Sequence, residues 1–173
     1  MGQVAATTHI LPAAAKRFPE MRQLHAYWLA RTPQDALLPG RQHIDPVEMP
    51  RALLPFLALI DLEKGARRRY RVRLAGTAFR NWAPLEFTGR SLDELAGGEG
   101  EHEFSAMLDS VVTGPAVRYL SSASVLPSCG HVRLHRLGMP LARNGYDPDM
   151  ILGIMLPART GEESTVCGAD AAQ

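Results

Sequence analysis

The chain has six histidines, the first side chains to consider as metal ligands. His131 and His135 are four residues apart, the spacing that lets two histidines on a helix bind one ion. The surrounding residues alternate between polar and apolar, which predicts a strand, and four residues of strand span roughly 13 Å. Zn–N bonds are only about 2 Å long. We therefore expect no metal site, and expect both histidines to face solvent at positions that alternate with Val132 and Leu134.

A thiol nucleophile is the second chemistry to consider. Cys129 lies in the predicted turn 127–130, two residues before His131, so a catalytic Cys–His pair is conceivable. A cysteine and a histidine that share a turn at the end of a strand are far more often neighbours through chain geometry alone than members of a catalytic pair. The sequence has no Gly-x-Ser-x-Gly elbow and no Gly-x-x-x-x-Gly-Lys phosphate loop. We expect no enzyme, and a small thiol-dependent enzyme using Cys129 and His131 remains the alternative.

The segment Arg67–Arg73 is the one basic cluster, and it could contact nucleic acid. The formal net charge of the chain is +1, so no global field attracts a polyanion or an anionic membrane. We favour the solvated outer face of a strand for these arginines. An acidic protein partner and a nucleic-acid adaptor remain the other interpretations.

Composition indicates an ordinary soluble domain. The chain has 173 residues, of which 46% are hydrophobic and 21% are charged. No apolar run approaches the roughly 18–20 residues that span a bilayer, and the first residues lack the pattern of a secretory signal. Cys129 and Cys167 are the only cysteines, which fits a reducing compartment. We expect a cytoplasmic protein with one domain over residues 18–157, a flexible segment 1–17 and a disordered tail 158–173.

A helix is predicted from Pro19 to Arg31, because Thr32 precedes a proline and disfavours helical geometry. Met21, Leu24 and Trp28 recur at helical spacing and form one apolar face. We expect this face to be the surface of a homodimer. Packing against the protein's own sheet is the alternative destination.

The strands are predicted from residue 56 onward. Residues 56–63 are apolar at nearly every position, as in a strand covered on both faces. Residues 69–75 alternate, so that Tyr70, Val72 and Leu74 face inward. After an amphipathic helix over Glu101–Thr113, three further strands are expected at 117–125, 131–137 and 150–156. Asp45-Pro46 predicts the start of a very short helix.

This order of elements, and several of its segments, resemble a family of small alphaproteobacterial PAS domain proteins that carry an Arg-x-x-Ile-Asp-Pro motif. The resemblance covers residues 25–157, and its matching segments are Trp28–Arg31, Leu38–Pro46, Leu53–Pro55, Tyr70–Thr77 and Thr88–Leu92. It implies an α+β fold, a PAS-like five-stranded antiparallel sheet with short helices on one face and an N-terminal flanking helix. It also implies a sensory or regulatory protein.

The chain departs from that family before Gly89-Arg90. An aromatic-Gly-x-x-Leu-Thr-Gly stretch is usual there, and Trp82–Phe87 stands in its place. Pro84 should alter the loop beside the pocket, so a ligand of the relatives is not carried over. Haem-binding relatives usually take a ligand from the long helix, where only His102 lies near the start, and no Asn-Cys-Arg-Phe-like segment for a flavin is present. We expect no cofactor.

The resemblance places a pocket between the sheet and the helices. Its expected lining is Tyr70, Val72, Leu74, Phe79, Trp82, Met107, Val111, Val132 and Leu134. Apolar concave spaces with a few polar groups are the usual sites for small molecules, although these side chains could also fill one another's gaps. We expect a stand-alone module that acts through protein–protein contacts, with a signalling protein of a phosphorelay as a plausible partner and a small ligand as a modulator.

Overall fold

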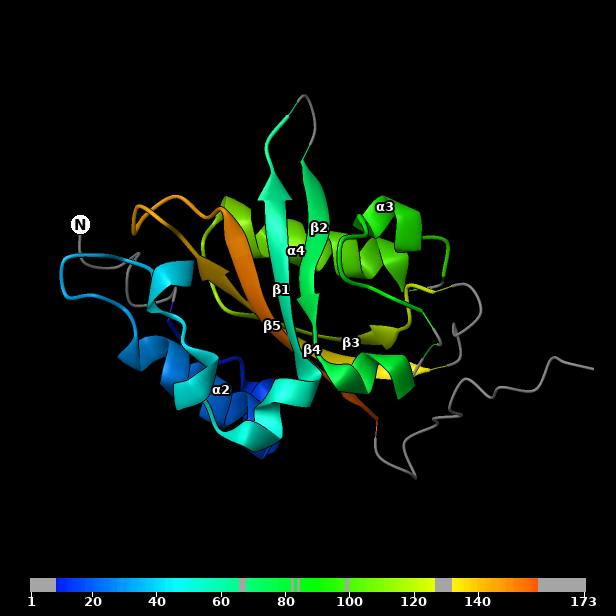
Figure 1. Ribbon diagram of the computed structural model, residues 1–173, viewed down its shortest axis with the longest axis horizontal. Coiled ribbons are helices and arrows are strands. Elements are labelled where there is room, and N and C mark those ends of the chain that lie inside the picture. The colour runs from blue at the N-terminus through cyan, green and yellow to red at the C-terminus, as the bar shows by residue number, and fades with distance from the viewer. Residues whose placement is uncertain are drawn as a thin grey trace, which may run out of the picture.

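The structure is a computed structural model and describes residues 9–65, 68–81, 83, 85–98, 100–126 and 132–158. Five strands form one antiparallel sheet in the order β2-β1-β5-β4-β3 (Figure 1). The strands are β1 (Leu57–Glu63), β2 (Arg69–Ala75), β3 (Arg118–Ala123), β4 (Arg133–Leu141) and β5 (Met150–Pro157). This confirms the predicted five-stranded sheet.

The described helices are α2 (Pro19–Ala30), α3 (Leu92–Leu95) and α4 (Glu101–Thr113), and short 3-10 helices connect the other elements. The latter are η1 (Ala13–Arg17), η2 (Arg41–His43), η3 (Pro46–Glu48), η4 (Arg51–Phe56) and η5 (Thr77–Asn81). The predicted cap at Asp45 is present, because its Oδ1 accepts a hydrogen bond of 2.9 Å from the Val47 amide. No helix in these ranges has the length and apolar content of a membrane span.

Both faces of the sheet are covered by separate apolar clusters. One cluster joins α2 and the N-terminal 3-10 helices to β1, β4 and β5, and the other joins α3 and α4 to the opposite face. We call these the α2 face and the α4 face, and Figure 1 shows the two helices on either side of the sheet. Short helices on one face and an N-terminal flanking helix were both predicted. The structure shows in addition that the flanking helix, α2, covers the second face of the sheet.

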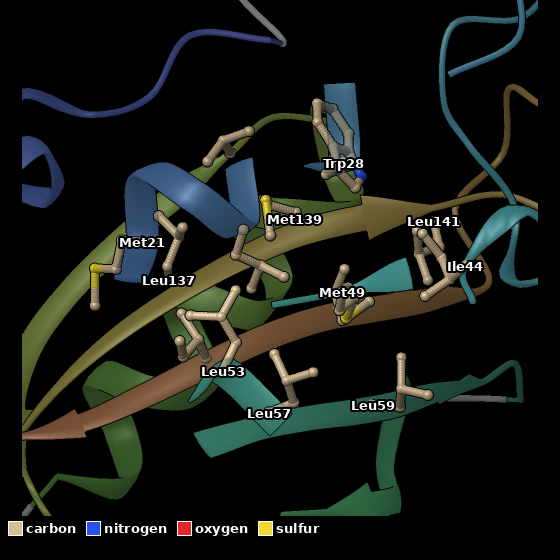
Figure 2. Packing of buried hydrophobic residues seen from close by; sticks show 14 of the residues in the cluster. Met21, Trp28, Ile44, Met49, Leu53, Leu57, Leu59, Leu137, Met139 and Leu141 are labelled. Atoms are coloured by element: carbon tan, nitrogen blue, oxygen red, sulfur yellow. The ribbon is translucent and has the colours of Figure 1, made fainter. Parts of the chain in front are cut away.

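The helix α2 packs on its own sheet. Met21, Leu24 and Trp28 have no exposed surface, and Figure 2 shows Met21 beside Leu137 and Trp28 above Met139 of β4. The Trp28 Nε1–H donates a hydrogen bond of 3.0 Å to the Pro140 carbonyl. The prediction of a homodimer surface here is wrong, because the apolar α2 face of the sheet needs this cover and takes it from the same chain.

The N-terminal segment differs from the expected flexible stretch 1–17 in its second half. Residues 13–17 form η1, with Ala15 fully buried and Leu11 nearly so against the α2-face cluster. The sequence shows no clear pattern here because only small residues and one leucine make the contact. Residues 1–8 and the tail from 159 onward lie outside the described residues.

The strand β2 contains a bulge that changes which side chains face inward. Leu74 and Val72 pair with consecutive residues of β1, so Arg73 has no partner there. An extra residue in one strand reverses the alternation of side chains beyond it. Tyr70 and Val72 face α4 as predicted, but Leu74 lies on the α2 face and is 43% exposed. The inward assignment of Leu74 is wrong for this reason.

The strand β4 is longer than the predicted 131–137, because it continues to Leu141. Gly138 and Pro140 weaken the strand pattern in the sequence. Gly138 has a packing reason to be glycine: a Cβ atom there would lie 2.9 Å from the Met107 side chain of α4. The close approach of α4 to β4 therefore depends on this residue.

Candidate ligand-binding cavity

A cavity of about 50 Å³ lies between the α4 face of the sheet and the helices that cover it. A single water needs about 10–15 Å³ by this measure, so the space accepts a few waters or one small molecule. Its walls come from the inward side chains of β1, β2 and β4, from α3 and α4, and from the segment 124–126. Tyr70, Ser124 and Arg136 are the polar residues of a wall that is otherwise apolar.

The structure brings most of the predicted pocket residues to this cavity. Those that line it are Tyr70, Val72, Phe79, Val132 and Leu134. Met107 and Val111 are buried in the same cluster, but they pack over Gly138 and do not line the space. Leu74 lies on the opposite face. Trp82 falls outside the residues that the structure describes.

Arg136 is the one charged residue of the cavity wall, and the sequence pattern did not lead us to expect it there. It lies on β4 and is 2% exposed. Its Nη1 donates a hydrogen bond of 2.7 Å to Ser122 Oγ, and its Nη2 donates one of 3.0 Å to the Ala123 carbonyl. Its guanidinium lies over the Phe104 ring, 4.9 Å from the ring centroid. The signal was present in the sequence, since the alternation that turns Val132 and Leu134 inward also turns Arg136 inward.

The positive charge of Arg136 is buried away from water, which destabilises the charged form. Burial is the largest influence and lowers the pKa of Arg136 to about 10, and the Glu103 carboxylate opposes that change. The guanidinium therefore stays protonated at neutral pH. Burying a charged group is costly unless it is paired and fully hydrogen-bonded. The Nε atom of Arg136 is buried without a hydrogen-bond partner, so this requirement is unmet.

Tyr70 contributes its ring to the cavity wall and its hydroxyl to a contact with α4. The hydroxyl donates a hydrogen bond of 2.6 Å to Asp109 Oδ1. Burial, then the bonded Asp109 carboxylate, raise the pKa of Tyr70 well above its usual value. The tyrosine is therefore a neutral donor that ties β2 to α4.

His135 does not face solvent, contrary to the sequence-based expectation. It is 2% exposed and lies on the α2 face of β4. Its Nδ1 is 2.8 Å from the Tyr119 hydroxyl, and its ring lies 4.7 Å from that of Phe18. Phe18 immediately precedes α2 and covers this part of the sheet, which is why the position is buried. His131 and Cys129 lie outside the described residues.

The Arg-x-x-Ile-Asp-Pro segment is held by a hydrogen bond within the segment and by hydrogen bonds to Tyr27 of α2. Arg41 Nη1 donates to the Ile44 carbonyl at 2.8 Å. The Tyr27 hydroxyl donates to the Asp45 carbonyl at 3.0 Å and accepts from the Asp45 amide at 2.8 Å. Arg41, Ile44 and Pro46 line a shallow groove of about 360 Å³ on the α2 face. The motif therefore shapes a connection over this face and takes no part in the cavity.

The basic strand is paired with acidic side chains. Arg71 Nε lies 2.5 Å from Glu63 Oε1, and Arg73 Nε lies 2.8 Å from Asp61 Oδ1. Arg69 lies 3.9 Å from Asp93. Arg67 falls outside the described residues. Across the described part of the chain no group of three or more His, Cys, Asp or Glu side chains is arranged to hold a metal ion.

The model of the PAS domain family matches residues 16–156. This match spans most of the chain, so the protein belongs to the PAS domain family and is a sensory domain by fold. A comparison with curated proteins finds no match.

The chain is similar to several solved structures. The chain is 16% identical to the LOV protein of Rhodobacter sphaeroides, with a TM-score of 0.50 and coverage of 66% of this chain and 68% of that one. A sensory box sensor histidine kinase from Vibrio cholerae shows 13% identity, a TM-score of 0.46 and coverage of 62% and 82%. A fungal LOV domain photoreceptor shows 11% identity, a TM-score of 0.48 and coverage of 83% and 97%.

Proposed function

We propose that this protein is a sensory PAS module that binds a small ligand in the cavity on the α4 face and signals by contact with another protein. The observation that supports the proposal is the cavity itself, enclosed by sheet and helices and lined by apolar side chains with three polar residues. Sites for small molecules have this character. Phe104 and Leu108 of α4 line the cavity. A bound ligand therefore contacts a helix that lies at the surface.

The output of the module is proposed to pass through protein–protein contact. A homodimer and a signalling partner, plausibly of a phosphorelay, remain proposals, as does a cytoplasmic location. The buried face of α2 is not available for such contact. Among the described residues, large apolar side chains that are exposed and could serve it are Ile10, Leu29, Val47, Leu74 and Tyr146.

We further propose that the protein has no catalytic activity and holds no metal or resident cofactor. The thiol-dependent alternative rests on Cys129 and His131, and it requires a thiolate that alkylating reagents modify faster than a free thiol at neutral pH. The nucleic-acid alternative is disfavoured by the pairing of Arg69, Arg71 and Arg73 with carboxylates. Binding to duplex or single strands at low salt would revive that alternative.

Native mass spectrometry of freshly purified protein tests the ligand proposal and reports the oligomeric state. Ala58 is buried and lines the cavity, so Ala58→Leu fills part of the space at a cost of about 1–3 kcal/mol of overpacking. Leu74→Ala, on the opposite face, is the control. If Ala58→Leu does not fold in a circular dichroism melt, Val132→Ile replaces it.

We expect the wild type and Leu74→Ala to carry a small-molecule mass that the filled variant lacks. A wild type that carries no such mass, and whose melting temperature no small molecule raises, would overturn the proposal. If both Ala58→Leu and Val132→Ile retain the bound mass, the ligand binds outside the cavity, and this result would also overturn the proposal.

A further inference from the structure

Arg136 is the only Lys, Arg, Asp or Glu side chain that is buried among the described residues. It lies in an apolar cluster, and its cross-strand neighbours on β3 and β5 are Leu120 and Met155. Charged side chains are rarely buried without a partner of opposite charge, because water must be removed from the charge. The position of Arg136 therefore calls for an explanation that packing does not supply.

The bonding of Arg136 inside the protein is incomplete. A guanidinium has five N–H donors, and Arg136 uses two of its nitrogens for bonds to Ser122 and to the Ala123 carbonyl. Its Nε is buried with no partner. Both of the acceptors are neutral, so the hydrogen bonds fix the guanidinium without neutralising it.

No carboxylate in the described part of the chain completes the pair. Within the described residues none of the ion pairs includes Arg136. Glu103 is the acidic residue whose charge acts on it, and that side chain is exposed on α4. Arg136 is therefore a cation at the wall of a cavity with one unused donor, the Nε–H, which protein atoms cover and which a ligand reaches only when the guanidinium or its neighbours shift.

We propose that Arg136 anchors a small carboxylate with a short apolar body, which occupies the cavity on the α4 face. This inference rests on the proposed function and names its ligand class. The flat fork of a guanidinium pairs with a carboxylate through two parallel hydrogen bonds. The unused Nε–H supplies one of them, and the ligand's charge offsets the charge of the arginine.

The rest of the cavity determines the polarity and the size of the remainder of the ligand. Ile60, Val72, Leu108 and Leu134 present only apolar atoms to it, and the volume of about 50 Å³ admits a short aliphatic chain. Inorganic phosphate has no apolar body, and a single arginine does not offset its second charge. The chemistry therefore fits a short-chain carboxylate of the size of propionate or butyrate.

The test is an NMR titration of the whole chain labelled with ¹⁵N, in which the Arg136 Nε–H signal is followed directly. The probes are sodium butyrate, the uncharged butyramide of the same shape, and inorganic phosphate. We expect butyrate to shift the Arg136 Nε–H signal and to bind at least tenfold more tightly than butyramide, with no shift from phosphate. Arg136→Met should weaken butyrate binding about ten- to a hundredfold, the range for a lost charged hydrogen bond.

Arg133→Met is the matched control. Arg133 lies on the same strand and is exposed, so its loss should leave butyrate binding unchanged. If Arg136→Met does not fold, the wild-type signal and the comparison of the three probes still decide the question.

The failures of the two proposals can be separated. Binding of butyramide as tight as that of butyrate, or a phosphate shift equal to that of butyrate, would overturn the carboxylate inference and leave the ligand cavity standing. An Nε–H signal that no probe moves would overturn the inference, and combined with a wild type free of any bound mass it would overturn the proposed function as well.

Discussion

The guanidinium of Arg136 lies over the ring of Phe104, with 4.9 Å between its central carbon and the ring centroid. This contact joins β4 to the first half of α4, and both side chains line the cavity. A ligand that pairs with Arg136 therefore acts next to a residue of α4. The contact adds a link through Arg136 to the direct contacts that Phe104 and Leu108 of α4 already offer to an occupant of the cavity.

The first prediction concerns this pair. A desolvated cation–π contact contributes up to about 2 kcal/mol, so Phe104→Leu and Arg136→Met should not be additive. We expect a coupling of about 0.5–2 kcal/mol in the free energy of unfolding, measured by urea denaturation of both single variants and the double variant. Coupling below about 0.3 kcal/mol would mean that the ring does not stabilise the charge.

The second prediction tests the packing of α2. Trp28 is fully buried and donates to the Pro140 carbonyl, so Trp28→Glu should cost more than the roughly 3–5 kcal/mol of a large-to-small core change. Gel filtration and circular dichroism should show an unfolded or aggregated chain. Leu29→Glu, at the neighbouring position, should fold because Leu29 is 38% exposed. A folded, monomeric Trp28→Glu protein would instead restore this face as a dimer surface.

The third prediction compares two residues of β2 that the bulge separates. Val72 lines the cavity on the α4 face, and Leu74 is 43% exposed on the α2 face. Val72→Thr buries a hydroxyl and should cost about 1–3 kcal/mol, whereas Leu74→Thr should change the unfolding free energy by about 0.5 kcal/mol or less. Chemical denaturation measures both. The reverse ranking would show that β2 keeps a regular alternation.

The residues of β2 also mark the limit of prediction from the sequence. Alternation placed Tyr70 and Val72 correctly, but it carried Leu74 to the wrong face because a bulge leaves no mark in an apolar–polar pattern. The helix ends were predictable where proline sets them, as at Pro19 and before Pro33.

The candidate site was only partly predictable, for a different reason. Apolar positions such as Val132 and Leu134 were expected at the pocket because burial of apolar residues is the default. Arg136 was missed because charged residues on strands usually face water. The alternation with Val132 and Leu134 already turns Arg136 inward, but the Ser122 and Phe104 contacts that hold it there come from other elements and are not visible in the local pattern. The buried His135 follows the same rule, with Phe18 as its distant cover.

The fourth prediction concerns pH. Burial, the largest influence, lowers the pKa of His25 below its ordinary value of 6.5, a hydrogen bond to the His9 carbonyl opposes this, and the His9 charge adds to it. As the pH falls below about 6.5, the unfolded chain binds a proton at His25 before the folded protein does, so stability is lost.

His25→Gln should therefore reduce the fall in melting temperature between about pH 7 and pH 5. Differential scanning fluorimetry across that range measures the fall, with Gln23→Ala on the exposed side of α2 as the control. An unchanged pH profile in His25→Gln would assign the pH dependence to other groups.

A crystal structure of the protein grown in butyrate is the most direct test of ligand binding at Arg136. We expect carboxylate density beside the Nε of Arg136, with the aliphatic end against Leu134 and Leu108. A cavity closed by its own side chains, or filled by ordered water alone at saturating butyrate, would contradict this expectation.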